Sequence, residues 1–219
     1  MTNVESLVQS ESLAFFGRVN ASISHELKNI MAIISETSGL MGDLCEIAED
    51  GGQYDPKTFK NLSASITEEI QRGFVTIKQM NRFAHSMDSF FADVKIVDLV
   101  ELMLSLSSFV SYSSNVSLTL PKDKSLTISS SPFLLELLIY EALIFGYKRN
   151  GKRKDIAVSV SELSGGGVGI RFENITESGD EVYIKDNIIH VAKAIGVSID
   201  EKMNPCIIDM VIPKEINEK

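Results

Sequence analysis

A helical pattern without a proline extends over about residues 6–48 and constrains the fold more than any other part of the sequence. Its apolar side chains recur at three- and four-residue steps, which places them on one face of an α-helix. This face has to be buried, because a long amphipathic helix gains most of its stability from tertiary packing. The face contains Phe16, Val19, Ile23, Ile30, Ile33, Leu40, Leu44 and Ile47, and Leu27, Ile34 and Met41 widen it.

A second helical pattern follows at about residues 56–91, after a short turn. Gly51 and Gly52 end the first helix, and the Asp55–Pro56 pair begins the second one. Two long amphipathic helices with a short connection form an antiparallel hairpin. The apolar face of the second helix contains Phe59, Leu62, Ile66, Ile70, Phe74, Ile77, Met80, Ala84, Met87 and Phe91.

A lone hairpin of two helices cannot bury both of these apolar faces well. Two hairpins that pair as a four-helix bundle would bury them, and the sequence therefore predicts a homodimer. The alternative is a two-helix arm that packs on the C-terminal part of its own chain. We favour the homodimer.

The periodicity changes after residues 92–95, which we interpret as a short connector. We expect helices at about residues 96–111, 132–148 and 183–195, and strands at about residues 116–120, 126–129, 155–161, 168–173 and 206–212. This order is typical of an α/β sandwich with helices on one side of a mixed sheet. The predicted fold class is α+β, with a helical hairpin domain at residues 1–92 and a sandwich domain at residues 96–219.

Composition and charge exclude several classes of function. The chain has 30 acidic and 21 basic residues and a net charge of −9, which argues against a generic nucleic-acid surface. No apolar run reaches the roughly 18 residues of a membrane span, and we expect no signal peptide and no membrane association. Cys45 and Cys206 lack metal-type spacing and fit two free thiols in a reducing cytosol, so we expect a cytoplasmic protein without a metal site.

One of the three histidines, His25, lies within the first helix in a polar setting. Residues three and four apart share a face of a helix, so the face of His25 also contains Ala21, Ser22, Lys28, Asn29 and Ala32. Another protein could approach an imidazole on this face. The alternative is an ordinary surface histidine. Glu26 interrupts the apolar face beside it, and such a local violation is expected more often at a functional site than elsewhere.

The segment His-Glu-Leu-Lys-Asn at residues 25–29 resembles the phospho-acceptor box of sensor histidine kinases. The order of elements over roughly residues 10–213 resembles the catalytic core of that family, with a dimerisation and histidine-phosphotransfer hairpin and an ATP-binding sandwich. The resemblance implies that His25 accepts a phosphoryl group, that Glu26 is its acid/base partner, and that Asn29 can orient water to dephosphorylate a receiver domain. Ala21, Ser22, Lys28 and Ala32 would line the surface on which the receiver docks.

Folding the hairpin at its glycines brings residues 78–85 near the level of His25. Lys78, Arg82 and His85 lie there, and a cation beside His25 would stabilise a phosphoryl group, with Arg82 and His85 as the candidates. The alternative is that these are solvated surface residues.

The second half of the chain departs from the family at each nucleotide motif. The helix at residues 137–143 lacks the two asparagines that bind Mg²⁺ and phosphates, and Glu141 replaces the metal-binding one. Residues 173–177 lack the glycines of the family's Asp-x-Gly-x-Gly box, and residues 186–190 contain no glycine to approach a phosphate. Four added carboxylates would repel a triphosphate, namely those of Glu177, Asp180, Glu181 and Asp186.

Two further features have structural interpretations. The glycines at residues 165–167 precede a strand and not a helix, so they indicate a hairpin turn and not a phosphate loop. His190 has apolar neighbours in its helix, and we expect it to be packed structurally.

The leading hypothesis is a dimeric histidine phosphotransferase of a two-component phosphorelay, built on a kinase core with a degenerate ATP site. His25 would exchange a phosphoryl group with the aspartate of a response-regulator receiver, or accept it from a separate upstream kinase. The protein would need no cofactor of its own, because the receiver supplies Mg²⁺. One alternative is a non-catalytic, pseudokinase-like module that sequesters a response regulator or a kinase. Another is a receiver phosphatase that uses Asn29, and we disfavour an active autokinase.

Overall fold

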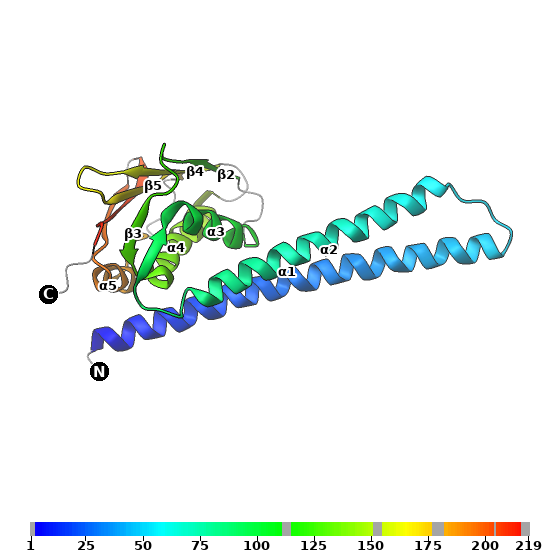
Figure 1. The fold of residues 1–219 in the computed structure, drawn as a ribbon, viewed down its shortest axis with the longest axis horizontal. Helices are drawn as coiled ribbons and strands as arrows, with labels where there is room; N and C mark the ends of the chain where they lie inside the picture. The colour runs from blue at the N-terminus through cyan, green and yellow to red at the C-terminus, as the bar shows by residue number, and fades with distance from the viewer. Residues whose placement is uncertain (1–2, 111–114, 151–154, 177–181, 204, 216–219) are drawn as a thin grey trace. The chain divides into compact units, whose positions relative to one another are not determined.

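The computed structural model describes residues 3–110, 115–150, 155–176, 182–203 and 205–215. It confirms the predicted α+β class, because a long helical hairpin is followed by a sheet with helices on one side (Figure 1). By internal contacts the chain divides into two compact units, residues 20–82 and residues 1–19 with 83–219. The predicted boundary near residue 92 stays a prediction.

The hairpin is formed by α1 (Asn3–Glu49) and α2 (Pro56–His85), which run antiparallel (Figure 1). Gly51 has a φ of 79°, and the amide of Gly52 donates to the carbonyl of Ile47 at 2.8 Å, so the two glycines end α1. The side chain of Asp55 accepts from the amide of Lys57 at 2.9 Å and caps the start of α2. The predicted hairpin and its turn are confirmed, but α2 ends at His85, six residues before the predicted end at residue 91.

The two helices of the hairpin pack closely between residues 20 and 82. Ile23 and Ile30 of α1 are fully buried, as is Thr76 of α2. A Cβ placed on Gly73 would lie 3.7 Å from Cγ2 of Ile30, so these two residues lie opposite each other. Several large apolar side chains in this part of the hairpin nevertheless stay exposed, namely Met31, Leu40, Ile47, Ile70, Phe74, Val75 and Ile77.

The main sheet has five strands in the order β2-β4-β5-β7-β6. Its strands are β2 (Val116–Thr119), β4 (Ile156–Glu162), β5 (Val168–Ile175), β6 (Ser198–Met203) and β7 (Cys206–Ile212). The β2–β4 pair is parallel and the other pairs are antiparallel, so the sheet is mixed as predicted. A separate antiparallel pair joins β1 (Ala92–Lys95) to β3 (Thr127–Ser130).

Helices cover one face of the main sheet (Figure 1). They are α3 (Ile96–Ser108), α4 (Pro132–Asn150) and α5 (Asp186–Ala194). Burial alternates along β4, β5 and β7, because one face of each strand turns to the helices and the other to solvent. Helix α4 packs on β4 and β5 and is buried along most of its length, which makes it the centre of the core.

Three sequence predictions in this half need correction. Residues 92–95 are not a plain connector but the strand β1, and the edge strand β6 was not predicted at all. The charged residues at 200–202 hide the alternation of β6, which pairs with β7 on one side only. Helix α5 begins at Asp186, three residues later than predicted. Residue 111, the predicted end of α3, lies outside the described residues.

The first turns of α1 belong to the same compact unit as the sandwich. Phe15 is fully buried, with its ring centroid 5.2–5.4 Å from those of Phe83, Phe133 and Tyr140. Phe133 and Tyr140 come from α4, so an aromatic cluster joins the start of α1, the end of α2 and α4. Ring pairs of this kind add to the stabilisation from burial alone.

Replacement of Phe15 by alanine is expected to destabilise the protein by about 3–5 kcal/mol, because it leaves a cavity among three rings. Chemical denaturation followed by circular dichroism measures the change. Leu13→Ala is the matched control, because Leu13 is two residues away on the same helix and 74% exposed. Equal losses in the two variants would contradict the packing role of Phe15.

Candidate functional site

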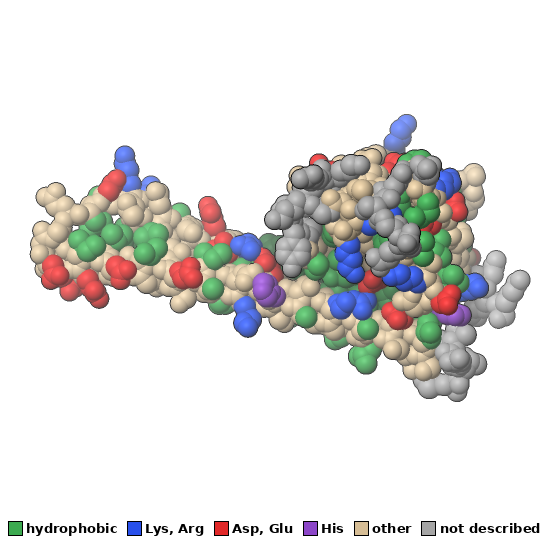
Figure 2. All heavy atoms as spheres, turned by 180° about the vertical axis from the view of Figure 1, so that it is seen from behind, with side chains coloured by type: hydrophobic (Ala, Val, Ile, Leu, Met, Phe, Trp, Pro, Cys, Tyr) green, Lys and Arg blue, Asp and Glu red, His purple; other side chains and the backbone are tan. Residues whose placement is uncertain are grey.

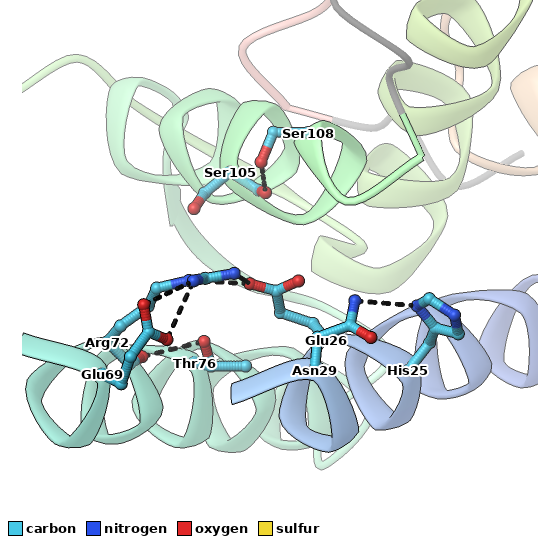
Figure 3. Close-up of polar contacts among 8 residues, drawn as sticks. All are labelled: His25, Glu26, Asn29, Glu69, Arg72, Thr76, Ser105 and Ser108. Atoms are coloured by element: carbon cyan, nitrogen blue, oxygen red, sulfur yellow. Dashed lines mark hydrogen bonds and ion pairs between the residues drawn. The ribbon is translucent and has the colours of Figure 1, made fainter. Parts of the chain in front are cut away.

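His25 is exposed on α1, between the fully buried Ile23 and Ile30 that fix which face of the helix is covered. Its ring turns toward Asn29, one helical turn on, with Nδ1 at 3.3 Å from the side-chain nitrogen of Asn29 (Figure 3). The predicted display of this imidazole is therefore present in the structure. The contact uses the Nδ1 edge of the ring.

The amide of Asn29 can serve either protonation state of the Nδ1 atom of His25. Its nitrogen donates to an unprotonated Nδ1, and its oxygen accepts from a protonated one after the amide turns over. In the second arrangement the neutral ring carries its proton on Nδ1 and keeps a lone pair on Nε2. A ring in that tautomer can act as a nucleophile at Nε2.

Glu26 contacts α2 and not the ring of His25. Arg72 of α2 donates through Nε to Oε1 of Glu26 at 2.9 Å and pairs with the same oxygen through Nη2 (Figure 3). Nη1 of Arg72 also donates to both oxygens of Glu69, at 2.9 and 3.1 Å. The hydrogen bond with Glu26 raises the pKa of the Arg72 guanidinium. Glu26 and Glu69 are both half-buried.

Sequence reasoning missed Arg72 and Glu69. The available signal was the position of Glu26 on the apolar face of α1, where a carboxylate needs a cation from the helix that packs against it. The predicted candidates lie further along α2, toward its end at His85. Lys78, Arg82 and His85 are exposed, and Nδ1 of His85 lies 2.8 Å from a carboxylate oxygen of Asp88. Their role beside a phosphoryl group stays a prediction.

The predicted docking residues lie on the face of α1 that carries His25. Ala21, Lys28 and Ala32 are exposed, and Ser22 is half-buried. Small side chains on both sides of an imidazole leave room for a partner to approach the ring. Their contact with a receiver domain stays a prediction.

In α4, Glu141 forms an ion pair within the chain. Its Oε1 atom accepts from Nη2 of Arg18 on α1 at 2.5 Å. Sequence resemblance placed the metal-binding asparagine of a kinase at this position. A carboxylate paired with an arginine is already charge-balanced and serves as a link between α1 and α4.

The segment at residues 174–176 is bonded to the end of α4. Asn150 accepts from the amide and the hydroxyl of Thr176 at 2.7 and 3.0 Å and donates to the carbonyl of Asn174 at 2.9 Å. Arg149 donates to the carbonyl of Thr176 at 3.1 Å. The polar groups at the position that the resemblance assigns to the glycine box are therefore hydrogen-bonded within the chain. The predicted repelling carboxylates of Glu177, Asp180 and Glu181 lie outside the described residues.

Tyr183 fills space beside α4. It is buried, its hydroxyl donates to the carbonyl of Leu138 at 2.8 Å, and burial raises the pKa of its phenol well above the ordinary value. The cavity next to it measures about 90 Å³ and is lined in part by Glu141, Lys148 and Lys185. Ligand pockets usually measure about 300–1,000 Å³.

The remaining candidate features lie in a strand turn and in α5. The glycines at residues 165–167 form the predicted strand turn, with positive φ at Gly165 and Gly166. His190 is half-buried in α5. Within the described ranges no group of three or more His, Cys, Asp or Glu side chains is placed to hold a metal ion. No described helix has the length and apolar character needed to cross a membrane.

Comparison with known proteins finds similar folds among solved structures. The histidine kinase AdeS of Acinetobacter baumannii is 13% identical, the match covers 89% of this chain and 98% of that one, and the TM-score is 0.46. The blue-light activated histidine kinase EL346 of Erythrobacter litoralis is 14% identical, with 90% and 63% covered and a TM-score of 0.45. The catalytic domain of the histidine kinase ThkA is 12% identical, with 57% and 97% covered and a TM-score of 0.44.

These identities and TM-scores are low, so the likeness is distant and carries no statement about function. No protein-family model matches the chain, and no curated protein matches it.

ATP with Mg²⁺ is expected to leave the melting temperature unchanged, because residues 137–143 and 173–177 lack the asparagines and glycines that the resemblance assigns to a nucleotide site. Differential scanning fluorimetry of the full chain measures this. A ligand at a hundred times its dissociation constant would stabilise the fold by about 2.7 kcal/mol, which is a readily measured shift. A rise of several degrees with ATP, but not with Mg²⁺ alone, would contradict the expectation.

Proposed function

We propose that this protein is a dimeric histidine phosphotransferase that exchanges a phosphoryl group between His25 and the aspartate of a response-regulator receiver domain, without binding ATP. The observation that carries the proposal is the exposed imidazole of His25, in contact with Asn29 within a five-residue box that resembles the kinase acceptor box. The self-bonded segment at residues 174–176 and the Arg18–Glu141 pair support the absence of a nucleotide.

The transfer needs a nucleophile in line with the phosphorus atom and little else from this chain. Nε2 of neutral His25 attacks the phosphorus of the aspartyl phosphate, the N–P bond forms, and the acyl O–P bond breaks. The aspartate leaves as a carboxylate, and the proton on Nδ1 stays on the phosphorylated ring until solvent takes it. The chain positions the ring, and the receiver supplies Mg²⁺ to balance the phosphoryl charge. The reverse step follows the same path.

Exposed apolar side chains on the hairpin support the homodimer. Ile70, Phe74 and Ile77 follow one another at four- and three-residue steps on α2 and are each more than 40% exposed. Figure 2 shows apolar side chains gathered on the hairpin surface in view. A strip of this kind on a soluble helix marks a contact surface, and a second hairpin would cover it in a four-helix bundle.

The variant Phe74→Glu is expected to convert the dimer to a monomer, because a carboxylate at the centre of the bundle would have no cation to pair with. Light scattering after size-exclusion chromatography should give a mass near twice 24.1 kDa for the wild type and near 24.1 kDa for the variant. Val211→Glu is the control, because Val211 is exposed on the open face of the sheet. A monomeric wild type would contradict the dimer.

A receiver phosphatase is the second candidate, and the contact between Asn29 and His25 favours it. An amide near the docking face can orient a water molecule toward the aspartyl phosphate. In this case the receiver loses phosphate to water, and His25 carries none. A module that only sequesters a response regulator would bind the receiver without either reaction.

Incubation with receiver domains of the same genome carrying ³²P-phosphoaspartate is expected to label the wild type. The variant His25→Ala should acquire no label, whereas His190→Ala should be labelled normally, because His190 lies in α5 and only His25 lies in the acceptor box. Autoradiography after electrophoresis measures the transfer. Loss of receiver phosphate without label, abolished by Asn29→Ala, would replace transfer by phosphatase action. Binding without either reaction would indicate sequestration.

A further inference from the structure

Resting on the proposed function, we infer that Arg72 is a positioning residue that holds Glu26 away from His25, so that Asn29 and not Glu26 contacts the acceptor ring. The sequence resemblance gave Glu26 the role of acid/base partner. The contacts in residues 20–82 assign the carboxylate to α2 and the ring nitrogen to Asn29.

The hold of Arg72 on Glu26 depends on the geometry of the guanidinium. Two of its nitrogens face Glu26 Oε1, and the third faces both oxygens of Glu69 (Figure 3). A planar fork with several donors can satisfy two carboxylates at once, which a single ammonium cannot do equally well. Without the guanidinium, two half-buried carboxylates would repel each other and lose their shared counter-ion. Glu26 could then turn toward His25, its neighbour in the chain.

The two possible partners of the ring have different chemical effects. A carboxylate only accepts hydrogen bonds and favours the protonated imidazole ring. Protonation of phosphohistidine on Nδ1 makes the ring a better leaving group, because the N–P bond then breaks to give neutral imidazole as water attacks phosphorus. An amide can donate or accept, so it leaves the equilibrium between the protonated and the neutral ring nearly unchanged. Arg72 therefore lengthens the lifetime of the phosphoryl group on His25.

The test measures the half-life of phosphorylated His25 in the full chain. Phosphoramidate, a small phosphoryl donor, labels the histidine without a receiver, and the label is followed at neutral pH after desalting. Arg72→Met is expected to shorten the half-life by roughly three- to tenfold, where tenfold corresponds to about 1.4 kcal/mol. Arg72→Met combined with Glu26→Gln should restore the half-life to within about twofold of the wild type, because the carboxylate is then absent.

Glu69→Gln is the matched control and should leave the half-life unchanged, because the bonds from Arg72 to Glu26 remain. Should Arg72→Met fail to fold by circular dichroism, Arg72→Lys takes its place, and its half-life is expected to be shorter than that of the wild type, because a single ammonium cannot serve both carboxylates equally well. A double variant as labile as Arg72→Met, or no change in either Arg72 variant, would overturn the inference. Failure of transfer between His25 and any receiver would instead overturn the proposed function. The half-lives, which are measured without a receiver, would still test the role of Arg72.

Discussion

The burial of Phe15 among Phe83, Phe133 and Tyr140 ties the first turns of α1 to α4, and the rest of the sandwich unit is built around α4. Because α1 is one continuous helix, the same element also provides the exposed face of His25. The Arg18–Glu141 pair adds a charged link to this apolar one.

At the site itself, the charged groups that join the two helices are separate from the exposed imidazole. Two half-buried carboxylates on facing helices share one guanidinium, so removal of Arg72 leaves two carboxylates without their counter-ion near the helix interface. The imidazole of His25 lies outside this group and contacts a neutral amide. Under the proposed function, this separation keeps the chemistry on the ring apart from the charges that hold the helices together.

The sequence predicted the hairpin, the mixed sheet and the helices on one side, because long-range periodicity and turn residues report directly on burial and backbone shape. It missed β1 and β6, because four residues beside a helix and a charged edge strand give little alternation to detect. It also identified His25 and Asn29 as sharing a face, since four residues along a helix make one turn. The sequence did not predict the pairing of Arg72 with Glu26, because the two residues lie 46 positions apart and no local pattern indicates such a contact.

The sequence alone determined which side chains could do chemistry: one imidazole in a polar helical face, an amide one turn away, and nucleotide motifs without their asparagines and glycines. These properties follow from side-chain identity and helix geometry, which are local. Only the tertiary structure decided which groups are in contact. Glu26 pairs with Arg72, Glu141 pairs with Arg18, and Asn150 is hydrogen-bonded to Thr176. Such choices depend on which helix faces and strand ends meet, and that is fixed by the packing of the whole core.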